Sequence, residues 1–89
     1  MTEKKIRIGN KLGLHMRPAG AFVQLASRYE SKVLLIKDGF EANGKSILNV
    51  LLLQAEKGTE IRLQTSGPDE AEALEELADF LENEFDYKK

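Results

Sequence analysis

The sequence predicts an α+β fold, a two-layer sandwich in which three helices cover one face of a four-stranded sheet. Residues 4–8 and 60–65 alternate between polar and apolar side chains, as half-buried strands do. Two other segments repeat apolar residues at helical spacing, and a hairpin signal lies between them. The elements follow the order β-α-β-β-α-β-α. With 89 residues, the chain can build one hydrophobic core, so residues 1–89 are interpreted as a single domain.

The first strand and the first helix occupy the N-terminal third of the chain. Ile6 and Ile8 alternate with charged residues, which predicts a strand over 4–8 with one buried face. A helix is expected to start at Pro18, because the missing N–H of proline costs nothing in a first helical turn. Its apolar stripe consists of Ala19, Phe22, Val23, Ala26 and Tyr29. This assignment places His15 at the N-terminus of the helix.

Two short strands are expected next, over residues 32–36 and 40–43. The first is an apolar run, KVLLI, and the second is FEAN. The dipeptide Asp38-Gly39 between them favours a tight turn, because both positions of that turn need a positive φ. The two strands should therefore be antiparallel neighbours.

A short apolar helix is predicted over residues 47–53. Ser46 directly precedes it, and its hydroxyl can accept a hydrogen bond from an N–H of the first turn. The run ILNVLLL is apolar at too many consecutive positions for one buried stripe. We expect Ile47, Val50 and Leu53 to pack inward and Leu48, Leu51 or Leu52 to be partly exposed. An exposed apolar patch rimmed by Lys45 and Arg17 is typical of a protein-docking surface.

The last strand and the last helix follow a turn at Lys57-Gly58. Residues 60–65 alternate again, and Asp69 with Glu72 has the spacing of a capping box. The stripe of the final helix consists of Leu74, Leu77, Ala78, Leu81 and Phe85. Nine acidic residues and no basic one lie between positions 69 and 86. We interpret this charge as the solvated face of the helix.

Composition excludes several classes of function. The chain has no cysteine and a net charge of −2, and its basic residues are scattered rather than interleaved with aromatic ones. This pattern argues against a nucleic-acid-binding protein, and no apolar run is long enough to cross a membrane. The N-terminus lacks the apolar stretch of a signal peptide. We therefore expect a cytoplasmic protein that needs neither a cofactor nor a metal.

The only histidine, His15, can act as a nucleophile toward phosphorus. A neutral imidazole, with a reference pKa of about 6.5, is largely unprotonated at cytoplasmic pH. A phosphoryl group on it brings about two negative charges. The N–H groups of a helix N-terminus and the guanidinium of Arg17 are suitable partners for that charge. Pro18 should also restrict Arg17 to non-helical conformations, turning its side chain away from the apolar stripe.

Other interpretations of these residues remain open. His15 and Arg17 can be an ordinary helix residue and a surface charge in a structural interaction domain. A regulatory domain would act through Ser46 and the apolar helix, and only a phosphoryl carrier would lose function on His15→Ala. A small hydrolase using His15 is disfavoured, because no acid or orienting carboxylate is apparent near it in sequence. A phosphate on Ser46 would be accommodated by the helix dipole and by Lys45.

Three stretches, GLHMRPAGAFVQLAS, NGKSI and AEKGTEI, together with the acidic final helix, strongly resemble HPr. HPr is the histidine-containing phosphocarrier family of the bacterial phosphoenolpyruvate-dependent sugar phosphotransferase system, and the resemblance covers nearly the whole chain. It implies an open-faced β-sandwich of four antiparallel strands and three helices. It also implies a relay protein rather than an enzyme. In it, His15 is phosphorylated on Nδ1 by phosphorylated enzyme I and passes the group to a sugar-specific enzyme IIA.

The resemblance assigns further residues. Arg17 matches the phosphate-stabilising arginine of the family, with Met16 and Pro18 beside it at the helix N-terminus. Ser46 matches the serine that a dedicated HPr kinase/phosphorylase modifies in many members. The following helix looks like the docking helix for enzyme I, with Ile47, Leu48, Leu51 and Leu52 as its docking side chains. The protein is expected to be a monomer. The alternative is a regulatory relative that acts mainly through Ser46 or in a nitrogen-related branch.

Overall fold

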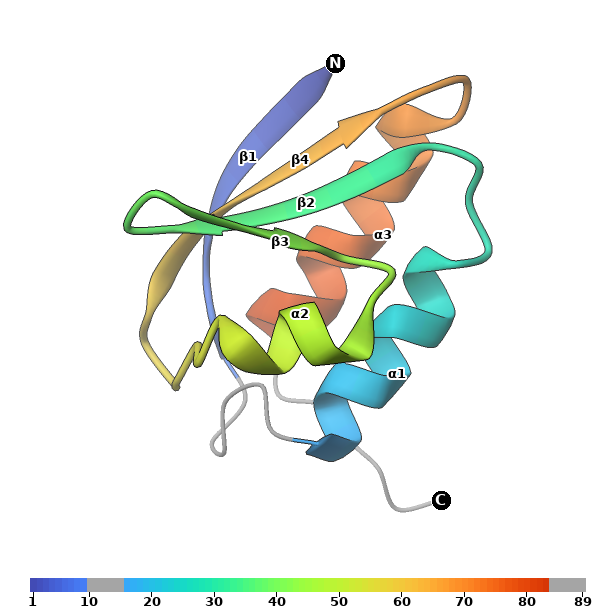
Figure 1. Ribbon diagram of the computed structural model, residues 1–89. Helices are drawn as coiled ribbons and strands as arrows, with labels where there is room; N and C mark the ends of the chain where they lie inside the picture. Colours follow the sequence, from blue (N-terminus) through green and yellow to red (C-terminus); the bar gives the residue numbers. More distant parts are fainter. Residues whose placement is uncertain (10–15, 84–89) are drawn as a thin grey trace.

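The computed structural model describes residues 1–9 and 16–83. Within them, four strands and three helices follow the predicted order (Figure 1). Their bounds are β1 (Thr2–Arg7), α1 (Met16–Ala26), β2 (Lys32–Lys37), β3 (Phe40–Asn43), α2 (Ile47–Leu52), β4 (Glu60–Ser66) and α3 (Glu70–Glu82). The predicted fold class is confirmed.

The sheet has the strand order β1-β4-β2-β3, and every neighbouring pair is antiparallel. Ile6 pairs with Ile61, and Leu35 pairs with Leu63, so these side chains point to the same face. Figure 1 shows all three helices on one side of the sheet. No helix of the described residues covers the opposite face, and Arg62 lies on it. The register therefore fixes which residues enter the core, because side chains alternate along a strand.

The turn between β2 and β3 has the predicted conformation. Asp38 has a φ of 49° and Gly39 a φ of 82°, and the strands pair from Lys37 and Phe40 onward. Positive φ at both central residues is what a two-residue hairpin turn of the right twist requires. The Asp38-Gly39 prediction is confirmed.

The core lies between the sheet and the helices. Its residues on the sheet side are Ile6, Ile8, Val33, Leu35, Ala42, Ile61 and Leu63, those on the helix side are Ala19, Phe22, Ala26, Val50, Leu53, Ala73, Leu77, Ala78 and Leu81, and Ala55 joins them from the chain between α2 and β4. Phe22 is fully buried, and its ring centroid lies 6.3 Å from that of Phe80. This pair joins α1 to α3 beneath the sheet. Of the predicted stripe of the final helix, Leu74 is only partly buried and Phe85 lies outside the described residues.

Helix α1 differs from its prediction at both ends. It begins at Met16, two residues before Pro18, and ends at Ala26, so Tyr29 packs against the core from the turn that follows. Arg17 is helical, and the prediction that Pro18 keeps it non-helical is wrong. Pro18 is the third residue of α1, and a proline in the first turn of a helix costs no intrahelical hydrogen bond. The restriction on the residue before proline is a bias, and the first turn overrides it.

The predicted capping box of α3 is also wrong. Asp69 is the N-cap residue, but its side chain makes no cap hydrogen bond. Its carboxylate instead accepts hydrogen bonds from the N–H of Glu30 at 2.9 Å, the N–H of Ser31 at 3.0 Å and the hydroxyl of Ser31 at 2.5 Å. The chain approaching β2 passes the start of α3 and offers these three donors. The carboxylate of Glu70 accepts a hydrogen bond from the N–H of Gly67 at 3.0 Å.

Ser31→Ala is expected to lower the Tm by about 5–15 °C, because it removes a buried hydroxyl that donates to a carboxylate. The Ser31 hydroxyl and the N–H groups of Glu30 and Ser31 hold the pKa of Asp69 below its usual 3.8. This stabilisation is therefore complete above pH 3.8 and is lost as the pH falls through the folded pKa. Thermal melts between neutral and acid pH test both effects. If the Tm of the variant fell between neutral and acid pH as steeply as that of the unchanged protein, this role of Ser31 would be contradicted.

Candidate functional site

The first turn of α1 presents one cation to solvent. Arg17 is exposed, whereas Pro18 and Ala19 are buried against the rest of the domain. The helix contains no acidic residue to neutralise its positive N-terminal end. The ion pairs recorded among the described residues are Met1 with Glu70 and Arg62 with Glu3, and neither involves Arg17. Among the residues that the structure describes, no carboxylate is paired with the guanidinium.

His15, the predicted nucleophile, lies outside the described residues. In sequence it directly precedes Met16, the first residue of α1. Its place at the helix N-terminus stays a prediction.

Ser46 is the N-cap of α2, as predicted. Its side-chain oxygen accepts a hydrogen bond from the N–H of Asn49 at 3.4 Å, and its carbonyl accepts one from the N–H of Val50 at 3.0 Å. The side chain of Asn49 reaches further and accepts a hydrogen bond from the N–H of Asn43 at 3.2 Å. Asn49 therefore attaches α2 to the edge strand β3, a role that the pattern of the sequence does not indicate.

Two lysines fix α2 and its surroundings. The ammonium of Lys37 donates to the carbonyls of Leu53 at 3.2 Å and Gln54 at 3.1 Å, just past the end of α2. A cation is favourable there because the last carbonyls of a helix have no intrahelical partner. The ammonium of Lys45, which was expected to meet a phosphate on Ser46, donates to the carbonyl of Tyr29 at 2.6 Å. The short helix is thus held at both ends.

Helix α2 exposes an apolar surface. Leu48 is 63% exposed and Leu52 is 58% exposed, as predicted, while Leu51 packs against the core. The prediction that Ile47 packs inward is wrong, because this residue is 39% exposed. It starts the helix beside α1, and its Cδ1 lies 3.6 Å from where a Cβ on Gly20 would stand. We call Ile47, Leu48 and Leu52 the docking face.

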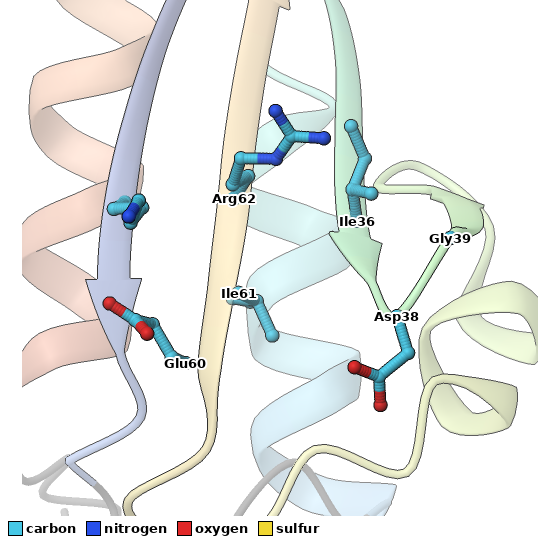
Figure 2. A pocket seen from close by; sticks show the side chains of 7 residues that line it. Ile36, Asp38, Gly39, Glu60, Ile61 and Arg62 are labelled. Carbon is cyan, nitrogen blue, oxygen red and sulfur yellow. The ribbon is translucent and has the colours of Figure 1, made fainter.

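The pocket in Figure 2 is separate from these residues. It is lined by Lys5, Ile36, Asp38, Gly39, Glu60, Ile61 and Arg62. Figure 2 shows Glu60 and Arg62 on β4 and Asp38 in the turn that follows β2. Charges of both signs share this pocket, so it has no preference for an anion. Among the described residues, no group of three or more histidines and carboxylates could hold a metal ion.

Comparison with known proteins decides the family. The protein-family model described as "PTS HPr component phosphorylation site" matches residues 2–83. The chain belongs to the HPr family. It is 46% identical over 85 residues to phosphocarrier protein HPr of Neisseria meningitidis, and the match covers 96% of each chain. It is therefore a member of the family of HPr phosphocarriers, which are non-enzymatic phosphoryl relay proteins.

Two further members of the HPr family are similar to this chain over most of its length. A crystal structure of HPr from Thermoanaerobacter tengcongensis superposes with a TM-score of 0.88, at 43% identity and over 92% of both chains. The HPr-like protein Crh of Bacillus subtilis is 45% identical over 84 residues, which cover 94% of this chain and 99% of that protein. The relatives of this chain thus include proteins named HPr and proteins named HPr-like. No helix in the described part of the chain is long and apolar enough to cross a membrane.

Proposed function

We propose that this protein accepts a phosphoryl group on His15 from phosphorylated enzyme I and passes it to a sugar-specific enzyme IIA. The observation that supports the proposal is the exposed Arg17 in the first turn of α1, two residues after His15 in sequence, which forms no ion pair with another described residue. The reaction places the protein in the cytoplasm, where phosphoenolpyruvate is made. Met16 and Pro18 complete the helix N-terminus beside the acceptor.

The step is a reversible displacement at phosphorus. The lone pair of His15 Nδ1 forms the N–P bond, and the bond between phosphorus and the donor's leaving atom breaks with its electron pair returning to that atom. The charge on the phosphoryl oxygens is stabilised by Arg17 and by the N-terminal N–H groups of α1. Transfer to enzyme IIA is the same displacement with the imidazole as leaving group.

The experiment follows label from phosphoenolpyruvate through purified enzyme I to this chain, and then to enzyme IIA. Both proteins should come from the same bacterium as the chain. Acid-labile label on the chain that moves on to enzyme IIA is the expected result. If enzyme I is phosphorylated and the chain gains no label, the carrier proposal is wrong.

Arg17→Ala is expected to slow transfer to and from the protein by about 10²-fold, the scale of one lost charge-assisted contact to the transition state. Quench-flow measurement of both directions checks this result. The matched control is Arg28→Ala, which removes an exposed arginine beyond the other end of α1. Equal rates for the two variants would contradict the role of Arg17.

Leu48→Glu is expected to raise the KM for enzyme I by about 30-fold, because it puts a charge on the most exposed residue of the apolar docking face. Leu48 is mostly exposed, so the variant should fold. Ser66→Glu adds the same charge on the open face of the sheet and should leave the KM unchanged. A normal KM for Leu48→Glu would show that enzyme I docks elsewhere.

A regulatory role through Ser46 is the second candidate, and the likeness to Crh supports it. The Ser46 side chain is half-buried, and its oxygen, the atom a kinase would modify, is the acceptor of the α2 cap. HPr kinase/phosphorylase with ATP should then add an acid-stable phosphate that Ser46→Ala abolishes. Absence of that phosphate would eliminate this role, and a nitrogen-related branch would remain as the alternative to sugar transport.

We propose that the protein works as a monomer. The exposed docking face is then free for its partners. A structure described as an HPr dimer from Thermoanaerobacter tengcongensis shows that a relative can pair. Size-exclusion chromatography with light scattering decides between the two states at working concentration.

A further inference from the structure

The exposed apolar side chains of this protein gather in one segment of the chain. Apart from Met1 at the N-terminus, the large apolar residues exposed in the described part of the structure are Phe40, Ile47, Leu48 and Leu52. Three of them form the docking face on α2, and the fourth, Phe40, is the first residue of the edge strand β3. Single exposed apolar residues are ordinary, whereas a contiguous group of them marks an interaction surface.

Phe40 lies outside the hydrophobic core. It is 43% exposed, and the described residues that form the core or pack against it do not include it. Edge strands usually carry charged or polar side chains, because an apolar edge promotes aggregation. The exposed residues Glu41 and Asn43 of the same strand follow this rule, and Phe40 departs from it. A partner that covers the ring explains this departure.

Phe40 lies beside the C-terminal end of α2. It pairs with Lys37 across the turn between β2 and β3, so both side chains leave the sheet on the same face. That face is the helix side, because Ala42, two residues after Phe40, is buried in the core. The ammonium of Lys37 donates to the carbonyl of Leu53 at 3.2 Å, and Figure 1 shows β3 running alongside α2. Phe40 therefore continues the docking face beyond Leu52.

The other end of the docking face reaches α1. The Cδ1 of Ile47 lies 3.6 Å from where a Cβ on Gly20 would stand, and Gly20 follows the exposed Arg17 by about one helical turn. A surface thus runs from the first turn of α1 over α2 to β3. A standard interface covers about 800 Å² on each partner and about 20–30 residues. A partner seated on Arg17 and the docking face must therefore cover neighbouring elements as well.

We infer that Phe40 is a docking residue for enzyme I and enters an apolar depression on that partner, an inference that rests on the proposed function. The docking face is assigned to enzyme I, and Phe40 is continuous with that face, so one partner covers both. Aromatic side chains are enriched in the buried core of interfaces, where they contribute a large apolar area. Phe40 contributes to binding and takes no part in the chemical step.

Phe40→Ser is the test variant, and Glu41→Ser is the matched control. The two residues are neighbours in β3, both are exposed, and their side chains point to opposite faces of the sheet. Steady-state transfer from enzyme I gives kcat and KM, and calorimetric titration with enzyme I gives the dissociation constant. Thermal melts define a temperature at which both variants are folded.

We expect Phe40→Ser to raise the KM and the dissociation constant for enzyme I by about 5–10-fold and to leave kcat unchanged. Glu41→Ser should keep both constants within about twofold, because residues outside the buried centre of an interface contribute little. Normal constants in Phe40→Ser, or an equal loss in Glu41→Ser, would overturn the inference. So would normal binding to enzyme I with weakened binding to enzyme IIA. If enzyme I does not phosphorylate the unchanged protein, the proposed function fails instead.

If Phe40→Ser does not fold, an NMR measurement on the unchanged protein replaces it. Transferred cross-saturation from enzyme I should weaken the amide signals of Phe40 and Leu52 and leave that of Ser66, at the end of β4, unchanged. Saturation of Leu52 without saturation of Phe40 would overturn the inference.

Discussion

His15→Ala should abolish phosphoryl acceptance from enzyme I completely. No other side chain of the chain is an imidazole, so no second residue can form the acid-labile N–P bond. Arg17 and the N-terminus of α1 would remain in place, but they stabilise charge and do not attack phosphorus. Labelled phosphoenolpyruvate, enzyme I and gel separation at neutral pH measure the loss.

Ser46→Ala is the matched control for that experiment. Its hydroxyl caps α2, and replacing it should cost about 1 kcal/mol of stability and none of the label. Retention of label in His15→Ala would mean that another residue accepts the group. Loss of label in Ser46→Ala alone would point to the serine, and the carrier account would then be wrong.

Phe22→Ala should have the largest effect on stability, about 3–5 kcal/mol. Phe22 is fully buried, and its ring lies beside that of Phe80. Truncation to alanine therefore leaves a cavity between α1, α3 and the sheet. The free energy of unfolding of native proteins is about 5–15 kcal/mol, so the substitution removes a large part of it. Urea denaturation followed by circular dichroism measures it.

Phe40→Ala provides the comparison for Phe22→Ala. The two substitutions remove the same atoms, but Phe40 is 43% exposed at the start of β3. It should cost less than half as much, because part of its surface is already in water. Equal costs for the two variants would contradict the assignment of Phe22 to the centre of the core.

The element order could be predicted because each element has a local signal. The alternation that buries Ile6 and the Asp38-Gly39 turn depend on residues adjacent in sequence, and both were confirmed. The partners of Asp69 could not be predicted, because Ser31 lies 38 residues away. Capping-box spacing considers only hydrogen bonds within the first turn of the helix. In the structure, the carboxylate of Asp69 accepts hydrogen bonds from Glu30 and Ser31, just before β2, instead.

The candidate site, too, could be predicted only where the signal is local in sequence. Exposure of Leu48 and Leu52 followed from an excess of apolar residues in a six-residue helix. The orientation of Ile47 depends on how closely α1 approaches α2 at Gly20, a distance that no local pattern contains. Likewise, nothing near Gly9 in the sequence indicates that the end of α3 lies so close that a Cβ on Gly9 would stand 1.9 Å from the carbonyl oxygen of Glu82.

The carrier role is best tested by a long-range ¹⁵N–¹H NMR spectrum of the imidazole before and after treatment with phosphoenolpyruvate and enzyme I. We expect one phosphoryl group, lost on brief acid treatment, to appear on Nδ1 of His15. An unchanged imidazole spectrum alongside fully phosphorylated enzyme I, or a phosphate found on Ser46 instead, would contradict it.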